Sequence, residues 1–124
     1  MRAVFLDSAS LAEQDLDLSG LEACVDDWLS YPATTPAQCA ERIADADVIV
    51  TNKVVLDDLL IRGAARLKLI CITATGYNNV ALDAARERGI VVSNVVAYAT
   101  DSVAQHVFAL ILALGMLVDN AIVI

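Results

Sequence analysis

The chain has 124 residues and a formal net charge of −8, with 8 Lys and Arg against 16 Asp and Glu. An acidic surface repels phosphate backbones, and no stretch combines basic with aromatic residues, so we expect no nucleic-acid partner. At this length one compact domain is expected. Hydrophobic residues make up 58%, which is high for a soluble domain and indicates an apolar face made to contact something else.

The cysteines and the termini limit the class of protein further. Cys24, Cys39 and Cys71 are widely spaced and form no CxxC or Cys/His pattern, so we expect no metal site. Their odd number, with residues 1–6 running directly into a strand instead of a signal peptide, favours the reducing cytoplasm. The uninterrupted apolar stretch 107–118 has twelve residues. Because a bilayer span needs about 20, we expect a buried helix there and no membrane span.

Short apolar runs alternate with helical patterns along the chain. Continuous apolar strands are typical of parallel sheets that are buried on both faces. The expected strands are 3–6, 47–51, 67–73 and 90–93, with a weaker candidate for the second strand within 21–29, around residues 23–25.

The helical patterns carry recognisable start and stop signals. Pro36, after Thr35, opens the expected helix 37–46, and Gly89 ends the expected helix 80–88 as a C′ glycine. A third helix is expected at 56–65, and a last one from about residue 100 to at least 114, capped by Thr100 or Asp101. This alternation predicts an α/β fold, a flavodoxin-like doubly wound parallel sheet of about five strands plus a long C-terminal helix.

Ligands of open α/β sheets bind where the strands end, which draws attention to three loops: 51–53, 74–79 and the segment from Asn94 onward. Gly76 permits positive φ and close backbone approach, so the N–H groups around it can cradle a carboxylate, with Lys53 adding a positive charge. The alternative is an ordinary strand-to-helix turn in which Asn79 helps to start the next helix.

Other chemistry-bearing residues offer little. His106 is the single histidine and has no carboxylate three or four positions away, so we interpret it as packed or facing another domain and not as a general acid. None of the motifs GxGxxG, GxxxxGK[ST], GxSxG or HExxH occurs.

Three stretches, 46–53, 67–94 and 97–114, nevertheless resemble the D-2-hydroxyacid dehydrogenase family, in the family's order. The combination of Thr-Asn-Lys, Ala-Thr-Gly-Tyr-Asn and Thr-Asp-Ser-Val-Ala-Gln-His is most similar to the glycerate dehydrogenase (hydroxypyruvate reductase) branch. The resemblance covers residues 1 to 114. It implies an oxidoreductase that transfers a hydride between NAD or NADP and a small 2-oxo or 2-hydroxy acid such as hydroxypyruvate, glyoxylate or glycerate.

The resemblance also implies roles for matched positions. The substrate-side positions are Asn52, Lys53, Val54, Thr75, Gly76 and Tyr77, and the positions near the nicotinamide end of the cofactor are Thr75 and Thr100. In the family, the Gly-rich dinucleotide motif and the catalytic Arg, Glu and His come later than the region matched here. We therefore assign no catalytic residue and expect the chain alone to be inactive and to bind neither NAD nor NADP.

The resemblance further predicts a division of the chain. Residues 1–98 would be the N-terminal part of the substrate-binding domain, 99–114 an interdomain helix leading to a missing nucleotide-binding domain, and 115–124 an atypical apolar tail. The tail resembles a fragment of a transmembrane helix of resistance-nodulation-division efflux transporters; a hydrophobic extension that packs on an exposed core is the other interpretation.

We expect a homo-oligomer formed through the C-terminal helix. Two rival functions are a non-catalytic, flavodoxin-like ligand-binding or regulatory domain and a membrane-associated fragment.

Overall fold

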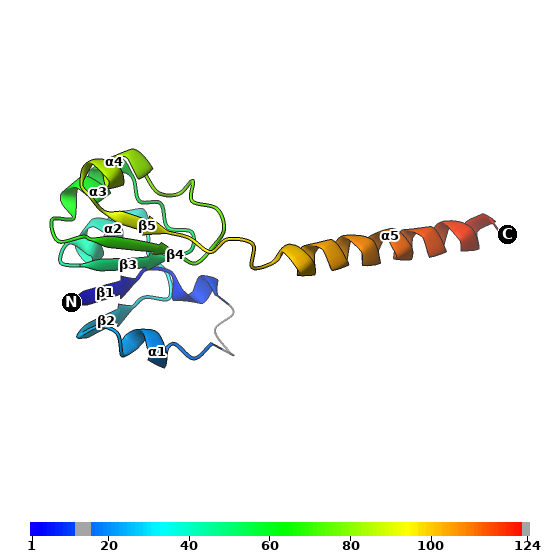
Figure 1. Ribbon diagram of the computed structural model, residues 1–124, viewed down its shortest axis with the longest axis horizontal. Coiled ribbons are helices and arrows are strands. Elements are labelled where there is room, and N and C mark those ends of the chain that lie inside the picture. Colours follow the sequence, from blue (N-terminus) through cyan, green and yellow to red (C-terminus); the bar gives the residue numbers. More distant parts are fainter. Residues whose placement is uncertain (12–15, 123–124) are drawn as a thin grey trace.

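A single parallel sheet organises the domain (Figure 1). The computed structural model describes residues 1–11 and 16–122, with side chains as far as residue 116. In these residues five strands pair in the order β2-β1-β3-β4-β5, which confirms the flavodoxin-like arrangement. The strands are β1 (Arg2–Phe5), β2 (Asp27–Ser30), β3 (Val48–Thr51), β4 (Leu69–Ile72) and β5 (Val91–Ser93).

Helices connect the strands and bury one face of the sheet. Buried side chains of three helices form one hydrophobic core with Val4, Ile49 and Ile70 of the sheet. A short 3₁₀ turn, Ser8–Ser10, follows β1. The helices are α1 (Ser19–Glu22), α2 (Pro36–Ile43), α3 (Asp58–Gly63), α4 (Leu82–Glu87) and α5 (Thr100–Ile122), of which α2, α3 and α4 supply the core.

Local sequence signals explain most of the helix boundaries. The N–H of Thr35 donates to the Gln38 side chain at 3.1 Å, as in a capping box, and Asp57 accepts the N–H of Leu60 at 2.9 Å. Gly89 has a φ of +68°, which confirms its role as the glycine that ends α4.

One expected strand position and one expected helix cap are wrong. Residues 23–25 form no strand, because their N–H groups donate to carbonyls of α1 and its end. The second strand is Asp27–Ser30, where Asp27 accepts a hydrogen bond from the Arg2 side chain at 2.6 Å. Thr100 does not cap α5 from outside, since it is the first helical residue and its hydroxyl donates to the Ala97 carbonyl.

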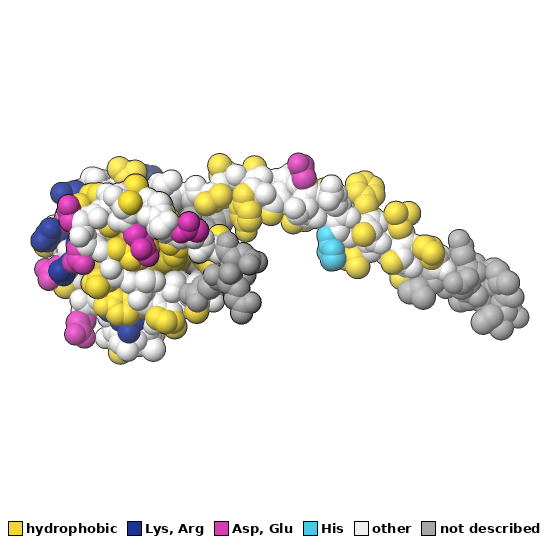
Figure 2. All heavy atoms as spheres, turned by 90° about the horizontal axis from the view of Figure 1, so that it is seen from below, with side chains coloured by type: hydrophobic (Ala, Val, Ile, Leu, Met, Phe, Trp, Pro, Cys, Tyr) yellow, Lys and Arg dark blue, Asp and Glu magenta, His cyan; other side chains and the backbone are white. Residues whose placement is uncertain are grey.

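The long helix α5 leaves the sheet and projects away from the body (Figures 1 and 2). The turn into it passes through Ala97, the one non-glycine residue with positive φ (57°) in the described chain, a conformation that costs about 1–2 kcal/mol. Figure 2 shows apolar side chains along α5, while most charged side chains lie on the body. Among the described residues, no helix combines the length and apolar character needed to cross a membrane.

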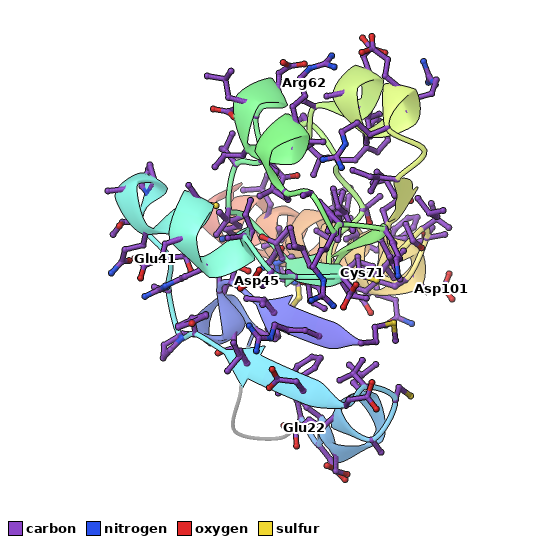
Figure 3. The ribbon with its side chains drawn as sticks, turned by 90° about the vertical axis from the view of Figure 1, so that its left-hand side faces the viewer. Glu22, Glu41, Asp45, Arg62, Cys71 and Asp101 are labelled. Atoms are coloured by element: carbon purple, nitrogen blue, oxygen red, sulfur yellow. The ribbon has the colours of Figure 1, made fainter. Side chains whose placement is uncertain are left out.

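A charged cluster closes the sheet at the amino ends of its strands, the end seen in Figure 3. The Asp47 carboxylate is only 3% exposed and accepts the N–H of Arg2 at 2.8 Å and the Arg66 guanidinium at 3.0 Å, with the Lys68 ammonium 3.6 Å away. The Arg2 N–H and these two cations hold the pKa of Asp47 below its usual value. This cluster lies at the opposite end of the sheet from the loops that the sequence implicates in binding.

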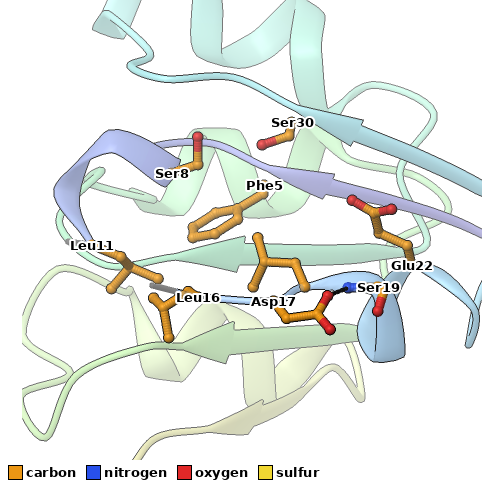
Figure 4. Close-up of a pocket in the computed structure, with 9 residues that line it drawn as sticks. Phe5, Ser8, Leu11, Leu16, Asp17, Ser19, Glu22 and Ser30 are labelled. Carbon is orange, nitrogen blue, oxygen red and sulfur yellow. Dashed lines mark hydrogen bonds between the residues drawn. The ribbon is translucent and has the colours of Figure 1, made fainter. Parts of the chain in front are cut away.

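The second face of the sheet is covered unevenly. Near β1 and β2, α1 lies over a pocket of about 390 Å³ beside Phe5 (Figure 4), and the Phe5 and Trp28 rings meet edge to face at 6.4 Å. Towards the other edge the cover ends: Cys71 of β4 is partly exposed and Val91 of β5 is 61% exposed. The described residues thus bury only one complete face of the sheet.

Candidate functional site

The carboxyl ends of all five strands point to the side from which α5 leaves (Figure 1). Two strand-end loops are joined there by a short parallel bridge between Leu56 and Val80. The Leu56 N–H donates to the Asn79 carbonyl at 2.8 Å, and the Ala81 N–H donates to the Leu56 carbonyl at 2.9 Å. The structure therefore brings the loop after β3 and the loop after β4 together, as the sequence predicts for neighbouring strands.

The loop after β3 has its backbone N–H groups fully engaged by one buried carboxylate. Asp7, at the end of β1 and 6% exposed, accepts the N–H groups of Asn52 (2.9 and 3.2 Å), Lys53 (2.6 Å) and Val54 (3.3 Å). Sequence reasoning missed Asp7. The available signal was an acidic residue directly after the first apolar run, at the strand end where ligands bind.

The carbonyls of the same loop are held from the other side. The Asn79 side chain donates to the carbonyl oxygens of Val54 at 3.0 Å and Asn52 at 3.4 Å, while the Asn52 side chain donates to the Ser10 hydroxyl at 3.0 Å. Asn79 therefore ties the two loops together and does not start α4, which begins at Leu82.

Lys53 is consequently the group of this loop that remains available to a ligand. Its side chain is exposed and forms no ion pair with the residues that the structure describes. It lines a cleft of about 890 Å³, together with Val54 and Asp7, on the side of the loop that faces α2 and α3. No hydrogen bond joins the Lys53 ammonium to the loop after β4 within the described chain. Lys53 and Gly76, which the sequence predicts to act on the same carboxylate, therefore lie at the same end of the sheet without a hydrogen bond between them.

The loop after β4 presents the opposite backbone pattern. Thr75, Gly76 and Tyr77 are exposed, and their N–H groups donate to no acceptor in the part of the chain that the structure describes. The Thr75 carbonyl, by contrast, accepts the Asn94 side chain at 2.8 Å. Because the C=O and N–H of one trans peptide point in opposite directions, this bond turns the Gly76 N–H away from β5. Consecutive unused N–H groups in a turn are a candidate anion site, because successive backbone donors can point at one ligand.

The conformation of Gly76 corrects one part of the sequence interpretation. Its φ is not positive; among the described glycines only Gly89 has that conformation. A Cβ built at residue 76 would meet nothing closer than the Asn78 side-chain oxygen at 3.4 Å, which is an ordinary contact. The domain itself therefore has room for a side chain here, and any need for glycine must come from a ligand.

The remaining candidates lie on or near α5. Thr100 is exposed at the start of the helix, and its hydroxyl can still accept a hydrogen bond. His106 is exposed on α5, so it is not packed within the described chain. No group of three or more His, Cys, Asp or Glu side chains that could hold a metal occurs in the described residues.

Comparison with known proteins decides the family. The family model for the catalytic domain of D-isomer specific 2-hydroxyacid dehydrogenases matches residues 4–121. The chain belongs to this family.

Individual relatives agree with the assignment. A putative 2-hydroxyacid dehydrogenase of Haemophilus influenzae is 42% identical over 92% of the chain, and a hydroxypyruvate reductase of Blautia hydrogenotrophica is 37% identical over 90%. Among solved structures, a D-lactate dehydrogenase of Aquifex aeolicus in complex with NAD and lactic acid is 26% identical, with a TM-score of 0.69; the match covers 89% of this chain and 32% of that one. The chain spans about a third of the length of these two curated relatives (36% and 35%).

Proposed function

We propose that this domain binds the carboxylate of a small 2-oxo or 2-hydroxy acid and, within a whole dehydrogenase, holds it for hydride exchange with NAD or NADP. The observation that carries the proposal is the contrast between the two joined loops. The N–H groups of residues 75–77 are unused and exposed, whereas those of residues 52–54 are all taken by Asp7. Unused backbone N–H groups, in a loop bridged to a second loop that carries an exposed lysine, suit an anionic ligand.

The contrast also refines the proposed roles. Thr75, Gly76 and Tyr77 would donate backbone N–H groups to the carboxylate, and Lys53 would add its charge. The backbones of Asn52 and Val54 would shape the loop and not contact the ligand. We propose hydroxypyruvate, glyoxylate or glycerate as the substrate class; the hydroxypyruvate reductase that is 37% identical supports this choice.

For the cofactor, the described residues suit only its reactive end. The exposed hydroxyls of Thr75 and Thr100 are the groups proposed to contact the nicotinamide end, which supplies or accepts the hydride. The sequence has no glycine-rich turn to hold a pyrophosphate. We therefore propose that tight binding of NAD or NADP needs residues outside this chain.

Titration of ¹⁵N-labelled chain with oxalate, a stable analogue of a 2-oxo acid, tests the carboxylate site. The amide signals of residues 75–77 should shift and saturate, with a Kd on the order of 1 mM for a small ligand held by one loop. The amides of residues 52–54 should shift much less, because Asp7 already occupies them. Shifts centred on residues 52–54, or none in either loop, would contradict the proposal.

A non-catalytic ligand-binding or regulatory domain is the second candidate. NADH consumption with hydroxypyruvate distinguishes the two. We expect none from the chain alone, and turnover from a whole dehydrogenase that carries this domain; a whole protein that binds the acid but does not oxidise NADH would favour the second candidate.

We also propose self-association through α5. The apolar side chains of Val103, Phe108 and Ile111, with five others up to Met116, are each at least 49% exposed. Burying a few hundred Å² of such surface contributes about 25 cal/mol per Å². The net charge of −8 opposes association, but salt screens it beyond about 8 Å.

Sedimentation of the chain at micromolar concentration should therefore show dimers or larger species, and a chain shortened at Asp101 should sediment as a monomer. A monomer in both forms would exclude the idea. The side chains of Leu117 and Val118, which the sequence adds to this apolar surface, lie outside those described.

The proposed division of the chain follows the same reasoning. Residues 1–98 would be the substrate-binding part, 99–114 the interdomain helix and 115–124 a tail, although the helix continues through Ile122 without a break. A cytoplasmic location remains a prediction.

A further inference from the structure

We infer that Asp7 is a positioning residue for the ligand: it holds the loop of residues 52–54 so that Lys53 is presented at the carboxyl end of β3, on the wall of the cleft that this loop forms with α2 and α3. The inference rests on the proposed function and deepens it. It starts from Asp7, whose carboxylate is buried at the carboxyl ends of the strands and whose side-chain hydrogen bonds in the described part of the chain all go to the loop that carries Lys53.

The Asp7 carboxylate directs all of its hydrogen bonds in the described chain to one loop. Its two oxygens accept three consecutive backbone N–H groups, the shortest contact, 2.6 Å, being with Lys53 itself. Bonds between a carboxylate and N–H groups are charge-assisted and therefore strong. Three successive peptides directed at one side chain leave the loop little freedom.

The loop is also held from its opposite side, which makes the position of Lys53 well determined. The Asn79 side chain donates to the carbonyls of Val54 and Asn52, and the Thr51 hydroxyl accepts a further bond from the Val54 N–H at 3.1 Å. With donors and acceptors of the backbone both engaged, the Lys53 side chain is the part of the loop that extends outward.

A second consequence concerns where an anion can bind. If Asp7 were absent, the N–H groups of residues 52–54 would be free to compete with residues 75–77 for a carboxylate. By occupying them, Asp7 removes the competing site. The negative charge of Asp7 would itself repel an anionic ligand. Asp7 can therefore favour ligand binding only if the benefit of holding the loop in place outweighs this repulsion.

Substitution Asp7→Asn separates these effects because it removes the charge and one acceptor while keeping the size. If Asp7 acts through position, the Kd for oxalate, read from the Gly76 amide shift, should rise about tenfold or more, the loss expected for a misplaced charged contact. Hydrogen exchange of the amides of residues 52–54 should also become faster. A Kd that falls or stays unchanged would overturn the inference, because removal of a mere negative charge predicts tighter binding.

Asp47→Asn is the matched control. Asp47 is also a buried aspartate that accepts a backbone N–H, but at the amino ends of the strands, away from both loops. It should lower stability without changing the oxalate Kd when both proteins are compared at a temperature at which circular dichroism shows them folded. An equal rise in Kd for Asp47→Asn would mean that Asp7 acts only through general stability and would overturn the inference.

Lys53→Met tests whether Asp7 influences oxalate binding through Lys53. Alone it should weaken oxalate binding, and adding Asp7→Asn to it should cause little further loss, because the position of an absent charge cannot matter. Additive losses would overturn the inference. Should Asp7→Asn not fold, Asn79→Ala releases the same loop from its carbonyl side and should raise the Kd only when Lys53 is present.

Failure of the wild-type chain to bind oxalate would instead overturn the proposed function, and this inference with it. Normal wild-type binding with an unaffected Asp7→Asn variant would overturn this inference alone.

Discussion

Replacing Gly76 by Val should abolish carboxylate binding while leaving the fold intact. The backbone at residue 76 is not in the left-handed region, and a Cβ there meets only the Asn78 side chain at 3.4 Å, so we expect a change in unfolding free energy within about 0.5 kcal/mol, as for other exposed positions. The branched side chain would stand over the unused N–H groups of the loop. Losing two charge-assisted hydrogen bonds at about 1.5–3 kcal/mol each predicts a 10²- to 10⁴-fold loss.

Two measurements test separately that Gly76→Val keeps its stability and that it loses carboxylate binding. Urea unfolding of Gly76→Val should match the wild type, while its amide shifts with oxalate should vanish; in a whole dehydrogenase carrying this domain, kcat/KM should fall by the same 10²- to 10⁴-fold. Gly76→Ala, with a single methyl group, should give an intermediate loss. Near-normal kcat/KM in the Val variant would show that Gly76 is only a turn residue.

Replacing Arg88 by Ala should cause the largest loss of stability expected from a surface substitution in this domain. The Arg88 guanidinium, just after α4, donates to the carbonyl oxygens of Ile61 (2.6 Å), Ala64 (2.9 Å), Arg62 and Ala65 (both 3.2 Å). These carbonyls lie at the C-terminal end of α3, where a helix leaves acceptors unsatisfied. A charged donor shared among them stabilises this end, and its removal should cost about 2–3 kcal/mol.

The neighbouring Arg86 provides the control. It belongs to the same helix and forms an ion pair with Asp83 at 3.3 Å, but both side chains are largely exposed. Arg86→Ala should therefore cost less than about 0.5 kcal/mol. The comparison is made by urea unfolding of both variants. Equal, small losses for the two would show that the Arg88 bonds contribute no more than a surface ion pair.

Local sequence information was enough for the sheet and for most of its connections. Four of the five strands and the four longer helices lie where apolar runs and caps predict them, because β-branched runs, the Thr35-Pro36 start and the Gly89 stop act over a few residues. The observed strand order is one of the common doubly wound orders that alternation and right-handed crossovers allow. The second strand was misplaced because the short helix α1 takes the backbone N–H groups of residues 23–25, a competition that the apolar pattern does not reveal.

The candidate site likewise has some features that the sequence predicts and others that it does not. Motifs in the family's order along the chain were enough to identify the family and the two loops that meet at the strand ends. The folded chain is needed to tell which loop has unused N–H groups. Asp7 lies 45 residues from Asn52 in the chain and Asn94 lies 19 from Thr75, yet these side chains determine where the peptides of both loops point. Hydrogen bonds between distant residues depend on how strands pair, and neither composition nor periodicity encodes them. For the same reason the sequence allowed a positive φ at Gly76, whereas the folded backbone does not use it.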